Sequence, residues 1–222
     1  NPSLSGLPAE PYRLDSDGKA FLWPTFGGIV YNVSVGDSAF GWVGDCIHPS
    51  VSIAHSDANK NRGLNVFACV GNDAMITSGA AKGARGVVTG KSGRFSDQVI
   101  IHFDVETRRK LAVDDQILVK SEGVGLAVPD CPDVAFKSLS PHLFDALPKK
   151  MESGALMMGV CGIVPPHFVG AGAGLTSEGG SLHIQSTDRA ELAKHGLDGL
   201  RLGDVVAIQD TDSRYNHGYL RG

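Results

Sequence analysis

Residues that could carry chemistry gather in a few polar clusters of the sequence. The first cluster is the segment Gly44-Asp45-Cys46-Ile47-His48-Pro49, where a carboxylate and an imidazole lie three residues apart beside a chain-stiffening proline. In a loop, Asp45 and His48 can converge on a metal ion or on a substrate. An Asp that caps a turn beside a surface His fits the same residues. The HExxH pattern of zinc enzymes is absent, so the sequence leaves the metal unknown.

The second cluster is the turn Cys69-Val70-Gly71-Asn72-Asp73-Ala74, which we expect to join two apolar strands. Gly, Asn and Asp together are typical of a hairpin, while Asn72 could also anchor a polar group of a substrate. Cys69 would need a base to act as a nucleophile, and no His lies near it in the sequence. A buried structural thiol is therefore the favoured interpretation of Cys69.

The densest polar cluster runs from Gln209 to Tyr219, directly after an apolar segment that predicts a strand. Its side chains would emerge where that strand ends, and they include two carboxylates, a cation, an imidazole and two tyrosines. Such a set can supply an acid, a base and a substrate clamp. It is not a calcium loop, because Tyr215 and Arg221 stand where that motif needs Gly and Glu. A plain solvated loop is the alternative.

These clusters favour a small-molecule enzyme, a hydrolase or a lyase, with its polar site at strand ends beside Gly-rich loops. In this hypothesis His48 or His217 is the base, and Arg214 or Tyr215 binds an anionic group of the substrate. The predicted catalytic residues are Asp45, His48, Asp210, Asp212 and His217, and the predicted substrate-binding residues are Asn72, Arg214 and Tyr215. The cofactor stays unknown.

A basic stretch from Ser78 to Gly93 supports a rival hypothesis. Gly90-Lys91-Ser92 matches the end of a phosphate loop, but Arg85 stands where the first glycine of that motif belongs. A KOW-type barrel turn fits better, with Gly86 opening one strand and the segment 99–103 pairing back. A small basic rim would then touch RNA or a protein partner, or only aid solubility. The rim consists of Lys82, Arg85, Lys91 and Arg94.

Composition narrows the partners and the compartment. The formal net charge is −4, from 20 Lys and Arg against 24 Asp and Glu, so nothing marks a general polyanion binder and nucleic acid is the less favoured partner. Four cysteines without a CxxC pair predict free thiols in a reducing compartment. Neither a signal peptide nor an apolar run of about 18 residues occurs. We therefore expect a cytoplasmic protein that does not enter a membrane.

The elements that must position these residues are mainly β. The 29 glycines suit a chain with many turns, and alternating or short apolar runs predict strands at 27–35, 64–70, 74–77, 86–89, 99–104, 116–120 and 202–209. Two short helices are expected after Ser140 and after Asp188, with Gly196 ending the second. The predicted fold is mainly β, with small barrel-like and sandwich units and a few short helices. Its three units, 1–63, 64–128 and 129–222, would pack as one body.

One local pattern recurs three times, as Val35-Gly36-Asp37-Ser38, Val113-Asp114-Asp115-Gln116 and Leu202-Gly203-Asp204-Val205. In each, Gly or Asp can form a tight turn, and the following Asp can accept a hydrogen bond from its own backbone. The pattern predicts three turns that return the chain to a sheet.

The chain resembles an uncharacterised bacterial and archaeal family, the domain of unknown function DUF4438. The matching segments span nearly the whole chain: Gly27-Gly28-Ile29, Tyr31-Asn32-Val33, Val35-Gly36-Asp37, Cys69-Val70-Gly71-Asn72, Ser78-Gly79, Ala81-Lys82-Gly83, Val88-Thr89-Gly90-Lys91 and Gly203-Asp204-Val205. The resemblance implies a mainly β fold of small barrel-like and sandwich pieces. It implies no activity and no catalytic residues.

Members of that family look longer and continue past the segment that matches Tyr219 to Gly222. One expectation is cleavage after Gly222, which would leave a second chain from the same precursor with a new N-terminal nucleophile. Truncation and disorder are the alternatives. The apolar segment from Gly154 to Phe168 also permits a homo-oligomer, and a purely structural subunit is a third hypothesis for the function.

Overall fold

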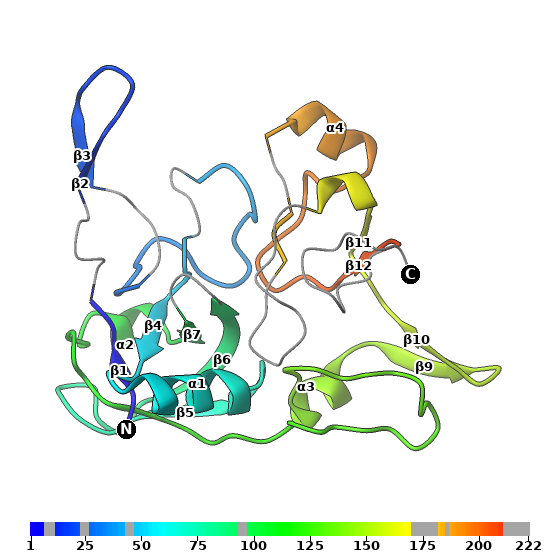
Figure 1. Cartoon of the computed structure of the whole chain (residues 1–222), viewed down its shortest axis with the longest axis horizontal. Coiled ribbons are helices and arrows are strands. Elements are labelled where there is room, and N and C mark those ends of the chain that lie inside the picture. The colour runs from blue at the N-terminus through cyan, green and yellow to red at the C-terminus, as the bar shows by residue number, and fades with distance from the viewer. Residues whose placement is uncertain are drawn as a thin grey trace.

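A six-stranded antiparallel sheet that nearly closes into a barrel dominates the protein (Figure 1). The computed structural model describes residues 1–6, 12–22, 27–42, 47–92, 97–169, 182–184 and 187–210. The strand order is β1 (Ser3–Leu4), β4 (Val51–Ala54), β7 (Gln98–His102), β6 (Arg85–Ser92), β5 (Asp73–Ile76) and β8 (Ile117–Val119). The two edges meet where Ser3 bridges Gln116 and the Leu4 N–H donates to the Asp115 carbonyl. The fold is mainly β, as predicted.

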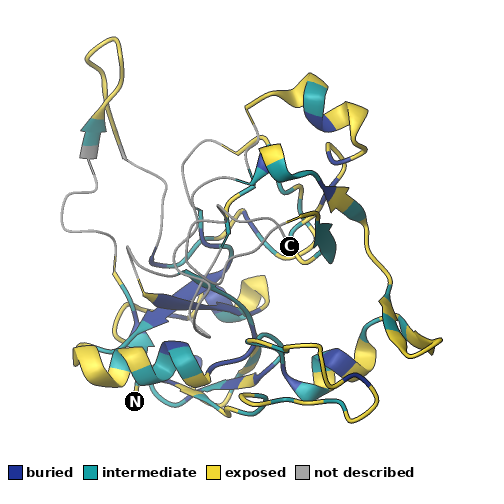
Figure 2. Cartoon of the chain, turned by 45° about the vertical axis from the view of Figure 1, so that its right-hand side comes forward, coloured by how far each residue is buried: buried dark blue, intermediate teal, exposed yellow. Residues whose placement is uncertain are grey.

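The barrel core consists of side chains on the inner face of this sheet. Alternate residues of a strand share a face, so Val99 and Ile101 of β7 point inward together with Val51 and Ile53 of β4, and all four are fully buried. In Figure 2 the middle of this sheet is dark blue. The predicted strands near β5, β6, β7 and β8 are confirmed.

The strand predicted at 64–70 is wrong, because most of it belongs to helix α1 (Ala58–Phe67). Asp57 caps this helix, and its side chain accepts a hydrogen bond from the Lys60 N–H, which is the strongest local signal for a helix start. Leu64 packs against the barrel core, and Asn65 donates from Nδ2 to the carbonyl of Asp97. The helix thus covers the barrel beside β7.

The strand predicted at 27–35 is also wrong, since this segment is irregular. Gly27 and Gly28 both have positive φ, at 96° and 73°, which bends the chain out of an extended conformation. The carbonyls of Val30 and Val33 accept hydrogen bonds from the buried guanidinium of Arg108, at the end of helix α2 (Val105–Arg108). Apart from Arg108, backbone at the start of β4 holds this segment, since Ile29 bridges Val51 and the Val30 N–H donates to the Ser50 carbonyl.

A smaller lobe lies above the barrel in Figure 1 and has its own core. Strands β11 (Gly162–Val164) and β12 (Val206–Ile208) pair in parallel, beside the short helix η1 (Pro166–Phe168) and helix α4 (Arg189–Lys194). Its core holds Val164, Phe168, Leu192, Leu197 and Leu200, and Ala39 and Phe40 pack against it. Helix α3 (Pro141–Ala146) and α4 confirm the predicted helices, with caps at Ser140 and Asp188.

Two hairpins extend from this body (Figure 1). One joins β2 (Tyr12–Leu14) to β3 (Ala20–Leu22), and the other joins β9 (Lys149–Glu152) to β10 (Ala155–Met158). The barrel draws its strands from both of the first two predicted units, and the division into three units stays a prediction. Within the described residues, no helix has the length and apolarity that crossing a bilayer requires. Cys69, Cys131 and Cys161 are free thiols.

Candidate functional site

The three recurring sequence patterns form three matching turns. The last residue of each turn is an Asp: Asp37, Asp115 or Asp204. Its N–H donates to the carbonyl three residues earlier, at 3.1 Å in each turn. The carboxylate of the same Asp accepts the N–H of that earlier residue at 2.7 to 2.9 Å. The residue before each Asp has positive φ, at 95°, 73° and 102°, as the third position of a type II turn requires. The predicted turns are confirmed.

Two of these turns meet, although about three quarters of the chain separates them. The N–H of Gly36 donates to the Leu202 carbonyl at 2.8 Å, and the N–H of Leu202 donates to the Asp37 carbonyl at 2.9 Å. Arg201 adds a bond from Nη1 to the Gly36 carbonyl at 2.7 Å. The backbones are packed so closely that a Cβ on Gly203 would lie 2.9 Å from a Val35 methyl group. This junction ties the smaller lobe to the loop above the barrel.

Below the junction lies a cavity of about 370 Å³, which we name the junction cavity. It lies between the outer face of β6 and β7, helix α3 and the two paired turns. Its lining residues are Val35, Pro49, Val70, Gly71, Val87, Val88, Thr89, Ile100, Leu143, Leu202 and Gly203. Most of these are aliphatic, and Thr89 is the one hydroxyl side chain among them. Walls of this kind bind apolar parts of small molecules, with polar specificity supplied from the rim.

Glycine shapes one wall of the junction cavity. Gly71 has a φ of 92°, and a Cβ at this position would lie 2.3 Å from Ser140 Oγ and 2.6 Å from Leu143 Cβ. Only glycine therefore lets α3 approach the turn before β5. The close approach brings the side chain of Leu143 to the cavity.

His48 lies next to the cavity-lining residue Pro49 but is itself buried, with 4% of its surface exposed. Its Nδ1 lies 2.8 Å from Ser52 Oγ and accepts the Gly27 N–H at 3.4 Å. Burial lowers the pKa of His48 to about 4, although a hydrogen bond with Gln98 acts in the opposite direction. The imidazole is therefore neutral at physiological pH.

Asn72 is fully buried beside Gly71, and its side-chain amide forms hydrogen bonds with backbone groups. Its Oδ1 accepts the Cys69 N–H at 2.8 Å, and its Nδ2 donates to the Glu122 carbonyl at 2.8 Å. The amide thus ties the turn before β5 to the segment that follows β8. Its predicted role as a substrate anchor is untested.

Of the other predicted site residues, Asp210 lies within the part of the chain that the structure describes. Asp210 is exposed two residues after β12 and has a φ of 50°. The rest lie outside the described residues: Asp45, Asp212, Arg214, Tyr215 and His217. Their assembly into one catalytic centre stays a prediction.

The predicted basic rim is spread along β6. Arg85 begins this eight-residue strand, Lys82 lies in the turn before it, and Lys91 lies near the strand's end, roughly 20 Å from Arg85 at the usual rise per residue. Lys91 Nζ donates to Ser138 Oγ at 2.9 Å, and Arg94 lies outside the described residues. The described basic side chains therefore do not form one compact patch.

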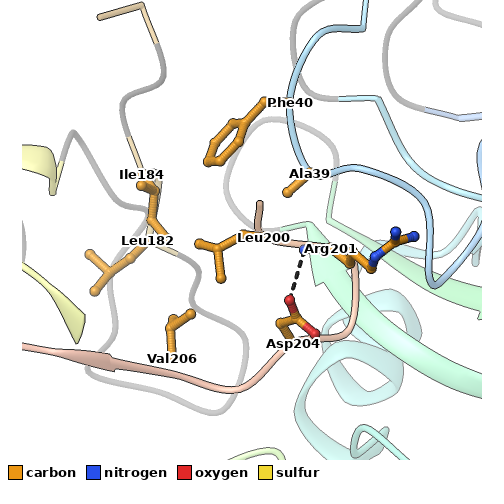
Figure 3. Close-up of a pocket in the computed structure, with 8 residues that line it drawn as sticks. All are labelled: Ala39, Phe40, Leu182, Ile184, Leu200, Arg201, Asp204 and Val206. Carbon is orange, nitrogen blue, oxygen red and sulfur yellow. Dashed lines mark hydrogen bonds between the residues drawn. The ribbon is translucent and has the colours of Figure 1, made fainter. Parts of the chain in front are cut away.

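A second, smaller cavity of about 240 Å³ lies in the smaller lobe (Figure 3). Phe40, Leu182, Ile184, Leu200 and Val206 surround it, and Ala39, Arg201 and Asp204 complete its lining. The carboxylate of the lining residue Asp204 already accepts the Arg201 N–H within the turn, as the dashed line in Figure 3 marks. Among the described lining residues, no free acid or base is presented to a substrate here.

Sequence reasoning missed the junction cavity because its lining carries almost no chemical signal. Val87 and Ile100 read as ordinary strand residues, and Leu143 reads as the apolar face of a short helix. The detectable signal was the recurring turn, but nothing in one sequence indicates that the turns at 34–37 and 201–204 pair with each other.

Comparison with known proteins places the chain in a family. One solved structure, the crystal structure of TM1086, is 37% identical, with a TM-score of 0.85 over 99% of this chain and 76% of that chain. No curated protein matches the chain. The N-terminal domain of DUF4438, a domain of unknown function, matches residues 12–145, and the C-terminal DUF4438 domain matches residues 146–222. The chain therefore belongs to the DUF4438 family.

Proposed function

We propose that this protein is a small-molecule enzyme, a hydrolase or a lyase, that holds an apolar part of its substrate in the junction cavity. The observation that carries the proposal is the cavity's position, where the paired turns, the loop after His48 and the turn before Asn72 all contribute lining residues. Its volume of about 370 Å³ falls within the range of ligand pockets.

The cavity's neighbours supply the polar chemistry in this proposal. Pro49 and Gly71 line the cavity one residue away from His48 and Asn72, and the chain runs from the lining residue Gly203 through β12 to Asp210. His48 or His217 would serve as the base, with carboxylates from Asp45, Asp210 and Asp212. Arg214 or Tyr215 would bind an anionic group of the substrate.

Filling the cavity tests the binding step. Val87 lines the cavity on β6 and is 42% exposed, and Trp is well tolerated in strands, so Val87→Trp should fill the space without unfolding the barrel. Binding of the apolar fluorophore anilinonaphthalene sulfonate should weaken at least about tenfold, as measured by its fluorescence. Leu118→Trp is the matched control, because Leu118 is 46% exposed on the same sheet and does not line the cavity.

The same pair of variants tests the chemistry. Hydrolysis of a panel of p-nitrophenyl esters and phosphates should be detectable in the wild type, lost in Val87→Trp and retained in Leu118→Trp. Equal turnover in the two Trp variants, or equal fluorophore binding, would remove the junction cavity from the proposal.

A homo-oligomer is a second proposal, and the β9–β10 hairpin favours it. This hairpin extends from the body and exposes Met151 by 42% and Met157 by 48% (Figure 1). Light scattering on Met151→Lys and Met157→Lys variants should show a lower mass than the wild type if the hairpin joins copies. An unchanged mass would argue against that role.

A further inference from the structure

The smaller lobe carries a group of three side chains that neither proposal uses. His167 lies on η1, and Glu191 and His195 lie four residues apart at α4. Positions i and i+4 of a helix share one face, and that face of α4 is turned toward η1. His167 is separated from α4 by more than twenty residues, so spacing in the sequence does not indicate this group.

The ligand atoms of this group converge on one point. Glu191 Oε1 lies 3.3 Å from His195 Nε2 and 3.9 Å from His167 Nε2, and the three atoms all lie within 4.8 Å of one another. Ligand atoms around a tetrahedral zinc ion, with bonds of about 2.0 to 2.1 Å, lie roughly 3.3 to 3.4 Å apart. A small inward movement of the His167 ring would complete that geometry.

The surroundings hold the two rings near each other. The imidazoles of His167 and His195 have centroids 5.5 Å apart, and the buried ring of Phe168 contacts both, at 4.5 Å and 5.6 Å. Leu192, one residue after Glu191, is fully buried in the lobe's core and anchors α4. The three ligand side chains nonetheless keep 30 to 57% of their surface exposed, so an ion can reach them from solvent.

Lys194 forms an ion pair with the other oxygen of the Glu191 carboxylate. Its Nζ lies 2.5 Å from Glu191 Oε2, which fixes the carboxylate and leaves Oε1 directed at the two imidazoles. The ammonium also places a positive charge close to the ion's position, and this charge opposes binding of a cation.

We propose that His167, Glu191 and His195 bind a divalent transition-metal ion, with Zn²⁺ as the best fit. Two imidazoles and one carboxylate suit zinc, whereas Mg²⁺ and Ca²⁺ prefer sets made of oxygen alone. Three protein ligands at an exposed site leave one coordination position for water, which is the arrangement of catalytic rather than structural zinc. The site is independent of the junction cavity, so either proposal can fail alone.

Titration calorimetry with ZnCl₂ tests the site on tag-free, EDTA-treated protein. The protein carries Cys161→Ser throughout, because an exposed thiol such as Cys161 can coordinate zinc and would obscure the titration. We expect one ion per chain, and affinity should fall at least about tenfold in His167→Gln, in His195→Gln and in Glu191→Gln. Co²⁺ should give a visible absorption band that disappears in the same variants.

Two further variants make the test decisive. His142→Gln is the matched control, since His142 and Glu122 form a surface pair at 3.1 Å without a third ligand in the described residues, and its affinity should equal that of the parent. Lys194→Met should bind zinc more tightly, a gain that misfolding cannot produce. Absence of saturable binding, or equal affinity in His167→Gln and His142→Gln, would overturn the proposed site.

Discussion

His48 shows how burial changes what a residue can do. Its neighbour Pro49 lines the junction cavity, while the imidazole itself faces the interior and is bonded through Nδ1. A neutral ring is the form that can accept a proton, but at 4% exposure any such proton would have to arrive through the protein. The sequence shows the residue type but not its burial.

The lowered pKa of His48 predicts a loss of stability in mild acid. The unfolded chain takes up a proton near pH 6.5, whereas the folded protein resists it until about pH 4, so stability falls as the pH drops through that window. The full difference amounts to about 3 kcal/mol on the scale of 1.36 kcal/mol per pKa unit. Urea unfolding at several pH values, compared between the wild type and His48→Gln, isolates this contribution.

In that comparison, His48→Gln should be less sensitive to acid than the wild type between pH 6.5 and 4. His183→Gln serves as the control, because His183 is an exposed histidine of the smaller lobe, and it should keep the wild-type profile. Identical profiles for all three proteins would show that His48 is protonated equally in the folded and unfolded states.

At the scale of elements, the three matching turns offer an internal comparison. Gly36 and Asp114 occupy the same position of their turns, with φ of 95° and 73°, but only Asp114 has a side chain that disfavours this backbone. Gly36→Ala should destabilise the protein by about 1 kcal/mol, and Asp114→Gly should be neutral or stabilising by up to about 1 kcal/mol. Denaturant midpoints of the two variants check both signs.

Gly203→Ala extends the comparison with a steric contribution. A Cβ at Gly36 would meet nothing within 4 Å, whereas one at Gly203 would press on Val35. Gly203→Ala should therefore cost more than Gly36→Ala. The opposite order would mean that the junction relaxes easily.

Local signals predicted the elements that begin or end with a clear marker. The caps Ser140 and Asp188 indicated α3 and α4, and the Gly-Asp pairs indicated the turns. The same kind of signal at Asp57 was overlooked because the apolar residues of 64–70 also suit a strand. At 27–35 the apolar alternation does not match the burial, since Val33 is buried while Tyr31 and Val35 are exposed. The contacts of this segment with Arg108 and with residues 50–52 cannot be read from one sequence.

For the whole molecule, the important division is between two apolar cores that are held by different amounts of hydrogen-bonded structure. The barrel core lies within six hydrogen-bonded strands, whereas in the described residues the smaller lobe's core is held by one pair of three-residue strands and short helices. Amides of β4 and β7 should therefore exchange with deuterium far more slowly than those of β11 and β12. Hydrogen exchange followed by mass spectrometry measures the difference directly.

Phe40→Ala should widen that gap. Phe40 packs against the smaller lobe's core although it lies early in the chain, within the N-terminal family domain. Its loss should speed exchange in β11, β12 and α4 while leaving β4 and β7 unchanged. Faster exchange throughout the protein would mean that the two cores unfold together.

At this largest scale, the junction cavity could not be predicted from the sequence. The junction cavity depends on the pairing of turns about 165 residues apart and on a helix that approaches Gly71. Neither contact leaves a trace in spacing or composition. What the sequence could indicate were the loops from which the lining comes. The segments around His48 and Asn72 were singled out for their polar residues, and the segment around Asp204 was singled out as a recurring turn.

The short strand β1 closes the barrel through very few bonds. On one edge of β1, the Leu4 N–H and carbonyl bond to the segment before β8, and the Pro2 carbonyl accepts the Ile117 N–H. On its other edge, β1 pairs with β4. If residues 1–6 left this position, β4 and β8 would each present an unpaired edge, and the same segment of a second copy could fill the gap. We therefore expect that, if two copies of this barrel exchange an element, residues 1–6 are the element exchanged.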